Sequence, residues 1–142
     1  MIRLSFFLLF VCAGVQLSFG QHRTVQHYVF STDSIEELEI VLPDSVDIRF
    51  WPGNTVLVEQ HIFMGHASKY LFAHFLEKTD RYRIEGEREG DLLRVAPVVM
   101  VREPLRDKDG FLIEEEVRYV VYMPDVFEPF AANRWRRKAR PE

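Results

Sequence analysis

The sequence contains almost no cysteine, because Cys12 is the only one among 142 residues. Cys12 falls within the first 20 residues, which we expect to be removed, so the mature chain would hold no thiol. That composition excludes disulfides, a cysteine nucleophile and cysteine-ligated zinc or iron–sulfur sites from the mature protein. The motifs G-x-S-x-G and H-E-x-x-H and a phosphate-binding glycine-rich loop are also missing. We therefore expect a protein that is not an enzyme and carries no cofactor.

Long hydrophobic runs are confined to the N-terminus. One basic residue, Arg3, precedes a nearly continuous apolar stretch over residues 4–15. Ser18 and Gly20 then provide small residues at the −3 and −1 positions of a cut before Gln21. This pattern predicts a secretory signal peptide over residues 1–20, with an uncleaved signal anchor as the alternative. We expect export to the periplasm, the cell envelope or the extracellular space.

The remaining 122 residues are enough for one domain with a hydrophobic core. Residues 21–142 carry 17 basic and 22 acidic side chains. The charges are unevenly placed, because five of the basic residues lie in the last nine positions: Arg134, Arg136, Arg137, Lys138 and Arg140. We expect a single acidic domain over residues 21–130 and a flexible basic tail over residues 131–142.

A β-hairpin is predicted by "VDIRFWPGNTVLVEQHI", residues 46–62. Apolar and polar residues alternate on both sides of Pro52-Gly53, which suits a turn. Trp51 would then be an outward-facing aromatic beside the turn. It is a candidate binding residue, and the alternative is that its ring covers neighbouring backbone.

Alternation of the same kind predicts further strands in residues 24–31, 36–43, 81–87, 91–101 and 111–124, with a turn at Gly90 between the third and the fourth. Glu115 interrupts the apolar face of the last one, which predicts a frayed end or a bulge. A helical stripe predicts one short helix over residues 66–78. The expected fold is mainly β, either an antiparallel sheet or a short β-helix-like stack, with this helix packed on it.

The order of "VDIRFWPGNTVLVEQHI", a helical insert, "RYRIEGEREGDLLRV" and "VYMPDVF" resembles a family of bacterial adhesin β-domains also described as head-GIN-like. The resemblance covers residues 36–127 and implies an exported, all-β protein whose short strands coil into a stack. It implies no catalytic motif, so no functional residue is carried over. Because the chain ends soon after "MPDVF", the expected form is a truncated, single-layer version.

Two clusters offer metal-binding alternatives. His61, His66 and His74 lie within fourteen residues, but the last two stand about 12 Å apart on a helix, too far for one ion. The segment "DKDGFLIEEE" places Asp107, Asp109, Gly110 and Glu116 as in the later part of an EF-hand loop. The first ligand position holds a leucine and the flanks resemble strands, so a turn explains the same residues.

Carboxylates are plentiful at residues 36–39 and 114–116, where paired acid–base chemistry would need two of them held around a substrate bond. The alternative to a binding role is therefore a metal-binding or hydrolytic periplasmic protein that uses these carboxylates or His61, His66 and His74. Solvated carboxylates on strand faces explain the same residues.

The basic tail "NRWRRKARPE" is the most distinctive candidate binding segment. Trp135 among arginines suits an anionic membrane interface or a flat partner. The candidate binding residues are Trp51, Arg134, Trp135, Arg136, Arg137, Lys138 and Arg140. We expect an adhesin-like binding or structural role in a bacterial cell envelope, with an anionic envelope surface or another envelope protein as partner. Nucleic acid is not expected, because the domain is acidic and exported, and the oligomeric state is left open.

Overall fold

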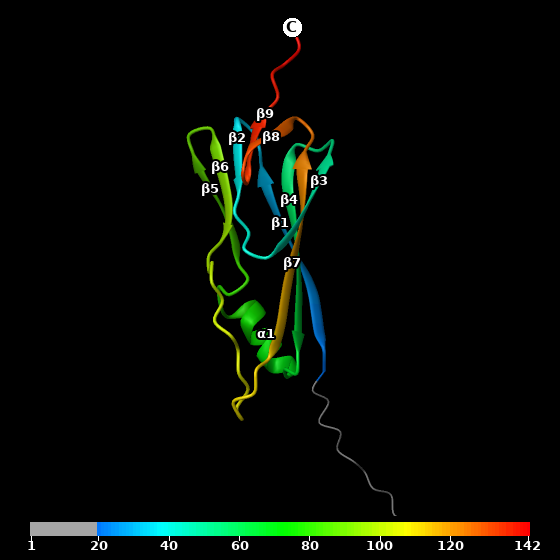
Figure 1. Ribbon diagram of the computed structural model, residues 1–142, viewed down its shortest axis with the longest axis vertical. Coiled ribbons are helices and arrows are strands. Elements are labelled where there is room, and N and C mark those ends of the chain that lie inside the picture. Colours follow the sequence, from blue (N-terminus) through cyan, green and yellow to red (C-terminus); the bar gives the residue numbers. More distant parts are fainter. Residues whose placement is uncertain (1–19) are drawn as a thin grey trace, which may run out of the picture.

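The computed structural model describes residues 20–142, which fold into two β-sheets and one short helix (Figure 1). The signal peptide predicted over residues 1–20 lies outside the described residues except for Gly20. The predicted fold class, mainly β with one short helix, is confirmed. The layering differs from the prediction, because the two sheets pack face to face in place of the expected single layer.

The first sheet has four strands in the order β1-β4-β7-β3. Its strands are β1 (His22–Ser31), β3 (Ser45–Trp51), β4 (Thr55–Gly65) and β7 (Glu114–Pro124). The second sheet has five strands in the order β5-β6-β2-β9-β8. Its strands are β2 (Glu37–Ile40), β5 (Ile84–Glu89), β6 (Leu92–Pro97), β8 (Phe127–Ala131) and β9 (Arg134–Arg137). Both sheets are mixed, because β3 pairs parallel with β7 and β2 pairs parallel with β6.

The predicted hairpin at residues 46–62 is wrong in its pairing, although both strands and the turn lie where the pattern places them. Strand β7 lies between β3 and β4, pairing parallel with the first and antiparallel with the second. Its inner face carries Val117, Tyr119, Val121 and Met123, all of them buried. A strand whose side chains are this apolar is most stable with a neighbour on each edge, so β7 takes the central place that a hairpin would close.

The second sheet contains the hairpin that the turn at Gly90 predicts. Strands β5 and β6 pair antiparallel across this glycine, whose φ of +63° lies in the left-handed region. Strand β2 lies beside β6 and brings Leu38 and Ile40 into the core. The alternation seen in the sequence of β2 therefore corresponds to one buried face.

Helix α1 (Lys69–Glu77) is shorter than the predicted 66–78. It begins after Ser68, whose hydroxyl accepts a hydrogen bond from the backbone N–H of Leu71 at 3.1 Å. His66 lies before the helix with a φ of +59°, and His74 is exposed, so the buried contact is made by Phe72. The helix lies at one end of the molecule, opposite the end from which the C-terminus leaves (Figure 1).

The hydrophobic core lies between the sheets and draws on nearly every strand. At one flank, β1 and β5 are closed over each other: a Cβ placed on Gly86 of β5 would lie only 2.6 Å from Cδ1 of Phe30 on β1. The Tyr28 hydroxyl also donates to the backbone oxygen of Tyr82 at 3.2 Å. The strand orders place β3 and β8 at the opposite flank.

Candidate functional site

A partly buried ionic cluster is centred on Glu115, the residue that interrupts the apolar pattern of β7. Arg81 Nε lies 2.8 Å from Glu115 Oε2, and Arg102 Nε lies 3.1 Å from Glu115 Oε1. The Tyr82 hydroxyl donates to Glu115 Oε2 at 2.5 Å. Arg102 also reaches Asp44, just before β3, with 2.7 Å between Nη2 and Oδ2. The paired charges therefore connect β7 to the segment that follows α1, to the segment between β6 and β7 and to the start of β3.

The electrostatics of this cluster keep each group in one protonation state. Burial alone would raise the pKa of Glu115, but hydrogen bonds from Arg81 and Tyr82 and the charges of both arginines hold it below its usual value. Burial and the hydrogen bond to Glu115 raise the pKa of Tyr82. The carboxylate therefore stays ionised and the phenol stays protonated near neutral pH. All of the carboxylate's near partners are supplied by the chain itself, so the arrangement is that of a structural anchor.

One side of the four-stranded sheet is turned away from the core, and we call it the outer face. Val29, Leu57 and Tyr122 occupy neighbouring positions on β1, β4 and β7. The Val29 side chain is exposed over 63% of its surface. One step along the strands, His27 and His61 flank Glu59, with 3.7 and 3.4 Å between the paired nitrogen and oxygen atoms. The outer face thus combines an apolar row with a row of charged and titratable side chains.

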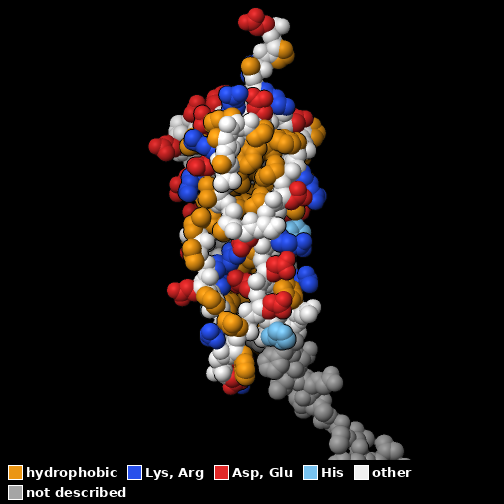
Figure 2. All heavy atoms as spheres, in the orientation of Figure 1, with side chains coloured by type: hydrophobic (Ala, Val, Ile, Leu, Met, Phe, Trp, Pro, Cys, Tyr) orange, Lys and Arg blue, Asp and Glu red, His pale blue; other side chains and the backbone are white. Residues whose placement is uncertain are grey.

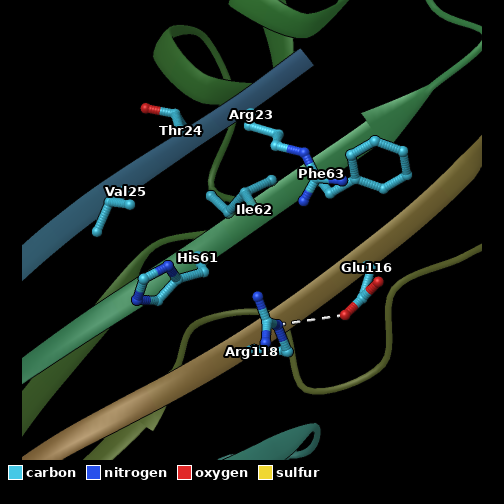
Figure 3. A pocket seen from close by; sticks show the side chains of 8 residues that line it. All are labelled: Arg23, Thr24, Val25, His61, Ile62, Phe63, Glu116 and Arg118. Atoms are coloured by element: carbon cyan, nitrogen blue, oxygen red, sulfur yellow. Dashed lines mark ion pairs between the residues drawn. The ribbon is translucent and has the colours of Figure 1, made fainter. Parts of the chain in front are cut away.

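A pocket of about 230 Å³ lies on the same face, where the start of β1 lies beside the end of β4 and the start of β7 (Figure 3). Arg23 places its guanidinium 4.5 Å from the centre of the Phe63 ring. Arg118 is paired with Glu116, with 3.3 Å between Nε and Oε1, and His61 lies on the neighbouring strand (Figure 3). This pocket is open to solvent. Arg118 already has a carboxylate partner, so Arg23 is the arginine of the pocket that has no acidic partner within residues 20–142.

Trp51 lies beside the turn as predicted, with its ring folded against it. Its indole Nε1 donates to the backbone oxygen of Thr55 at 3.0 Å. A Cβ placed on Gly53 would lie 2.3 Å from Cζ2 of the ring, so only glycine fits beneath it. Tyr122 contacts the ring edge-on, with 6.4 Å between ring centres. These contacts match the alternative reading, in which Trp51 covers neighbouring backbone, and they leave the ring half-buried.

The basic tail differs from its prediction, because residues 134–137 form strand β9 and are not a flexible segment. The arginines alternate around Trp135, which packs on the core, and carboxylates on neighbouring segments meet them. Arg134 faces Glu37, Arg136 faces Glu128 and Arg137 faces Glu36, at 3.5, 3.2 and 3.6 Å. Arg137 additionally donates to the backbone oxygens of Ile35 and Thr32.

These pairings change the candidate binding set. Of the five cations predicted to act together, three are paired with acids of the same chain, and Lys138 and Arg140 remain on the exposed end. The sequence signal for this strand was short, because Trp135 between Arg134 and Arg136 is a single apolar position within a charged run. It was masked by the expectation that a charged terminus is solvated.

The three histidines and the Asp107–Glu116 segment, considered above as metal ligands, do not form a metal site among residues 20–142. His61 lies on the outer face, whereas His66 and His74 flank or belong to α1. Asp107 Oδ1 accepts backbone hydrogen bonds from Asp109 and Phe111, both at 2.9 Å, which is a turn. Among residues 20–142, no three His, Cys, Asp or Glu side chains are grouped so that they could hold a metal ion.

Comparison with known proteins finds no matching family model and no significant similarity to curated proteins or solved structures. Within residues 20–142, the one helix has neither the length nor the apolar character needed to cross a membrane.

Proposed function

We propose that the protein is an exported, non-catalytic β-domain that binds another protein of the cell envelope through the outer face of its four-stranded sheet. The observation that carries this proposal is the row of Val29, Leu57 and Tyr122 on the outer face, where Val29 is exposed over 63% of its surface and the other two are half-buried. A solvated face of a sheet normally carries polar side chains. Apolar side chains beside charged ones are the usual composition of a binding surface.

Rigidity supports the same role. The strands under this face pair along nearly their whole length, from His22↔Met64 at one end of β1 to Ser31↔Thr55 at the other. Such pairing holds the backbone of this face in place, so little backbone conformational entropy is lost when a partner docks. The family resemblance, in which exported β-domains carry no catalytic motif, fits this proposal.

An anionic lipid surface is the weaker partner. Three arginines of the former tail are paired with Glu37, Glu128 and Glu36, which reduces the positive charge that β9 presents. Binding driven by the remaining Lys138 and Arg140 would be abolished by salt. Binding by the outer face would persist, because apolar contact is insensitive to screening.

The test is cosedimentation of the chain from Gln21 to Glu142 with isolated envelope fractions at low and high salt. We expect binding at both salt concentrations, lost when Leu57→Glu or Val29→Glu places a charge in the apolar row. A matched control, Lys108→Glu in the exposed turn before β7, should bind as the unaltered chain does. A form that ends at Arg137 keeps β9 and removes the last two cations.

Each outcome of that experiment decides one point. Loss of binding with the outer-face substitutions supports the proposal. Binding that disappears at high salt or in the form ending at Arg137 would point to an anionic surface and overturn it. Unchanged binding by both outer-face variants would also overturn it.

A further inference from the structure

Strand β3 forms an unpaired edge of the four-stranded sheet. Among the described strands, β7 alone pairs with it. The backbone oxygen of Trp51 accepts a hydrogen bond from Asp125 N on the β7 side, at 2.9 Å. Backbone groups of alternate residues point to opposite edges of a strand. The N–H and C=O groups of Val46, Ile48 and Phe50 therefore point to the free edge.

The same three residues direct their side chains toward the core but are incompletely covered. Their Cα partners on β7 are Tyr119, Val121 and Met123, which are buried. In contrast, Val46 is exposed over 37% and Phe50 over 51% of its surface. Hydrophobic side chains gather in the upper half of the face drawn in Figure 2, where Figure 1 places β3 beside the ends of β8 and β9. An edge that is both unpaired and apolar is a ready-made site for strand addition.

The charges of β3 identify the strand that fits this edge. Asp47 and Arg49 lie one residue on either side of Ile48 and are both exposed on the outer face, where they pair with each other at 2.9 Å. If a second β3 runs antiparallel about a two-fold axis at Ile48, Asp47 of each copy lies opposite Arg49 of the other. Val46 of each copy then lies opposite Phe50 of the other. The strand is thus complementary to itself in charge and in apolar surface.

The geometry points to a homodimer: we propose that β3 binds β3 of a second copy of this chain, antiparallel and centred on Ile48. The paired positions 46–50 and 48–48 exchange backbone hydrogen bonds, because these are the residues whose backbone groups face the free edge. The pairs of Asp47 with Arg49 fall at the intervening positions, where Cα atoms approach to about 4.5 Å and side chains interact most closely. The two four-stranded sheets become one continuous sheet.

The other exposed edges do not offer this match. Strand β5 carries Glu85, Glu87 and Glu89 at alternate positions, so a second β5 would bring like charges together. Strand β8 contains Pro129 and a register irregularity between Pro129 and Ala131. Proline and bulges block pairing at an edge. Strand β1 closes over β5 through Tyr28 and Phe30.

Charge reversal tests this pairing while leaving the fold intact, since both side chains are exposed. Asp47→Arg places an arginine opposite Arg49 of the other copy, and Arg49→Asp places two acids together. We expect the unaltered chain from Gln21 to Glu142, which contains every strand, to sediment as a dimer at micromolar concentration. Each single variant should dimerise roughly tenfold more weakly or worse, because like charges lie opposite each other.

The decisive measurement is whether reversing both charges restores dimerisation. A chain carrying both Asp47→Arg and Arg49→Asp regains complementarity and should dimerise again. The two single variants mixed in equal amounts should form a heterodimer more strongly than either associates with itself. Glu87→Arg on β5 serves as the control and should leave the association of β3 unchanged. A monomeric unaltered chain at high concentration, or single variants that associate as strongly as it does, would overturn the proposal.

Cysteine pairing tests the register. No cysteine lies within residues 21–142, so introduced thiols have no competitor. Asp47→Cys and Arg49→Cys chains, mixed and oxidised, should crosslink to each other, because those positions face each other at disulfide distance. Equal crosslinking of either variant with itself would contradict a pairing centred on Ile48. The measurement uses no envelope fraction, and the proposed binding face uses Val29 and Leu57, so either proposal can fail alone.

Discussion

Glu115 and Phe50 lie on the inner side of the same sheet, but the charged residue is largely enclosed and the apolar one is half exposed. Glu115 is the residue that breaks the apolar pattern of β7, yet it is almost enclosed and bound by two arginines and a tyrosine. Phe50 continues the apolar pattern of β3, yet half of its surface is exposed. The burial of each side chain follows from which segments of the chain lie opposite it. Side-chain polarity alone does not decide burial at either position.

Removing the enclosed carboxylate should have the largest effect on stability. Glu115→Ala leaves the partly buried Arg81 and Arg102 without their shared partner, and we expect the free energy of unfolding to fall by about 3 kcal/mol. The matched control is Glu116→Ala, since Glu116 points to the opposite face and pairs with Arg118 at the surface. That change should cost at most about 1 kcal/mol. Urea denaturation measures both, and equal losses would show that the cluster is not an anchor.

Truncating a valine at a buried position and at an exposed one should give unequal losses in the free energy of unfolding. Val121 and Val46 lie on the inner faces of neighbouring strands, and only Val121 is fully buried. We expect Val121→Ala to destabilise the fold by about 2 kcal/mol, from lost burial and the cavity left behind. Val46→Ala should cost about 0.5 kcal/mol or less at concentrations where the chain is monomeric. Comparable losses at the two positions would mean that β3 is covered after all.

Lowering the pH should remove the stabilisation that the ionised carboxylate of Glu115 provides. The folded-state pKa of Glu115 lies below its ordinary value of 4.5, so its contribution to stability is fully present above that value. This contribution is lost as the pH falls through the lower folded-state pKa. We expect the unaltered chain to lose more stability between neutral pH and pH about 3 than Glu115→Gln does. Parallel pH profiles of the two proteins would contradict a lowered pKa at Glu115.

Local pattern predicted most strands, because alternation of apolar and polar side chains is a property of neighbouring residues. Strands β1, β2 and β4 and the β5–β6 hairpin follow from it, as does the turn at Gly53. Partner choice does not follow from it. Strand β7 begins about fifty residues after β4, yet it lies between β3 and β4. The local sequence around the turn at Gly53 cannot show that a distant strand pairs there in place of a hairpin.

The amino-acid sequence alone was enough to predict the class of fold, the absence of thiols after residue 20 and the approximate places of the strands up to residue 124, but not β8 and β9. These follow from composition and from the period-two repeat, which act over a few residues. The tertiary structure alone decided that Glu115 is enclosed by Arg81 and Arg102 and that the arginines of β9 meet Glu36, Glu37 and Glu128. It alone decided that the apolar side of β3 stays open. Each of these outcomes depends on distant segments meeting in space, because burial and ion pairing are properties of neighbours that only the folded chain brings together.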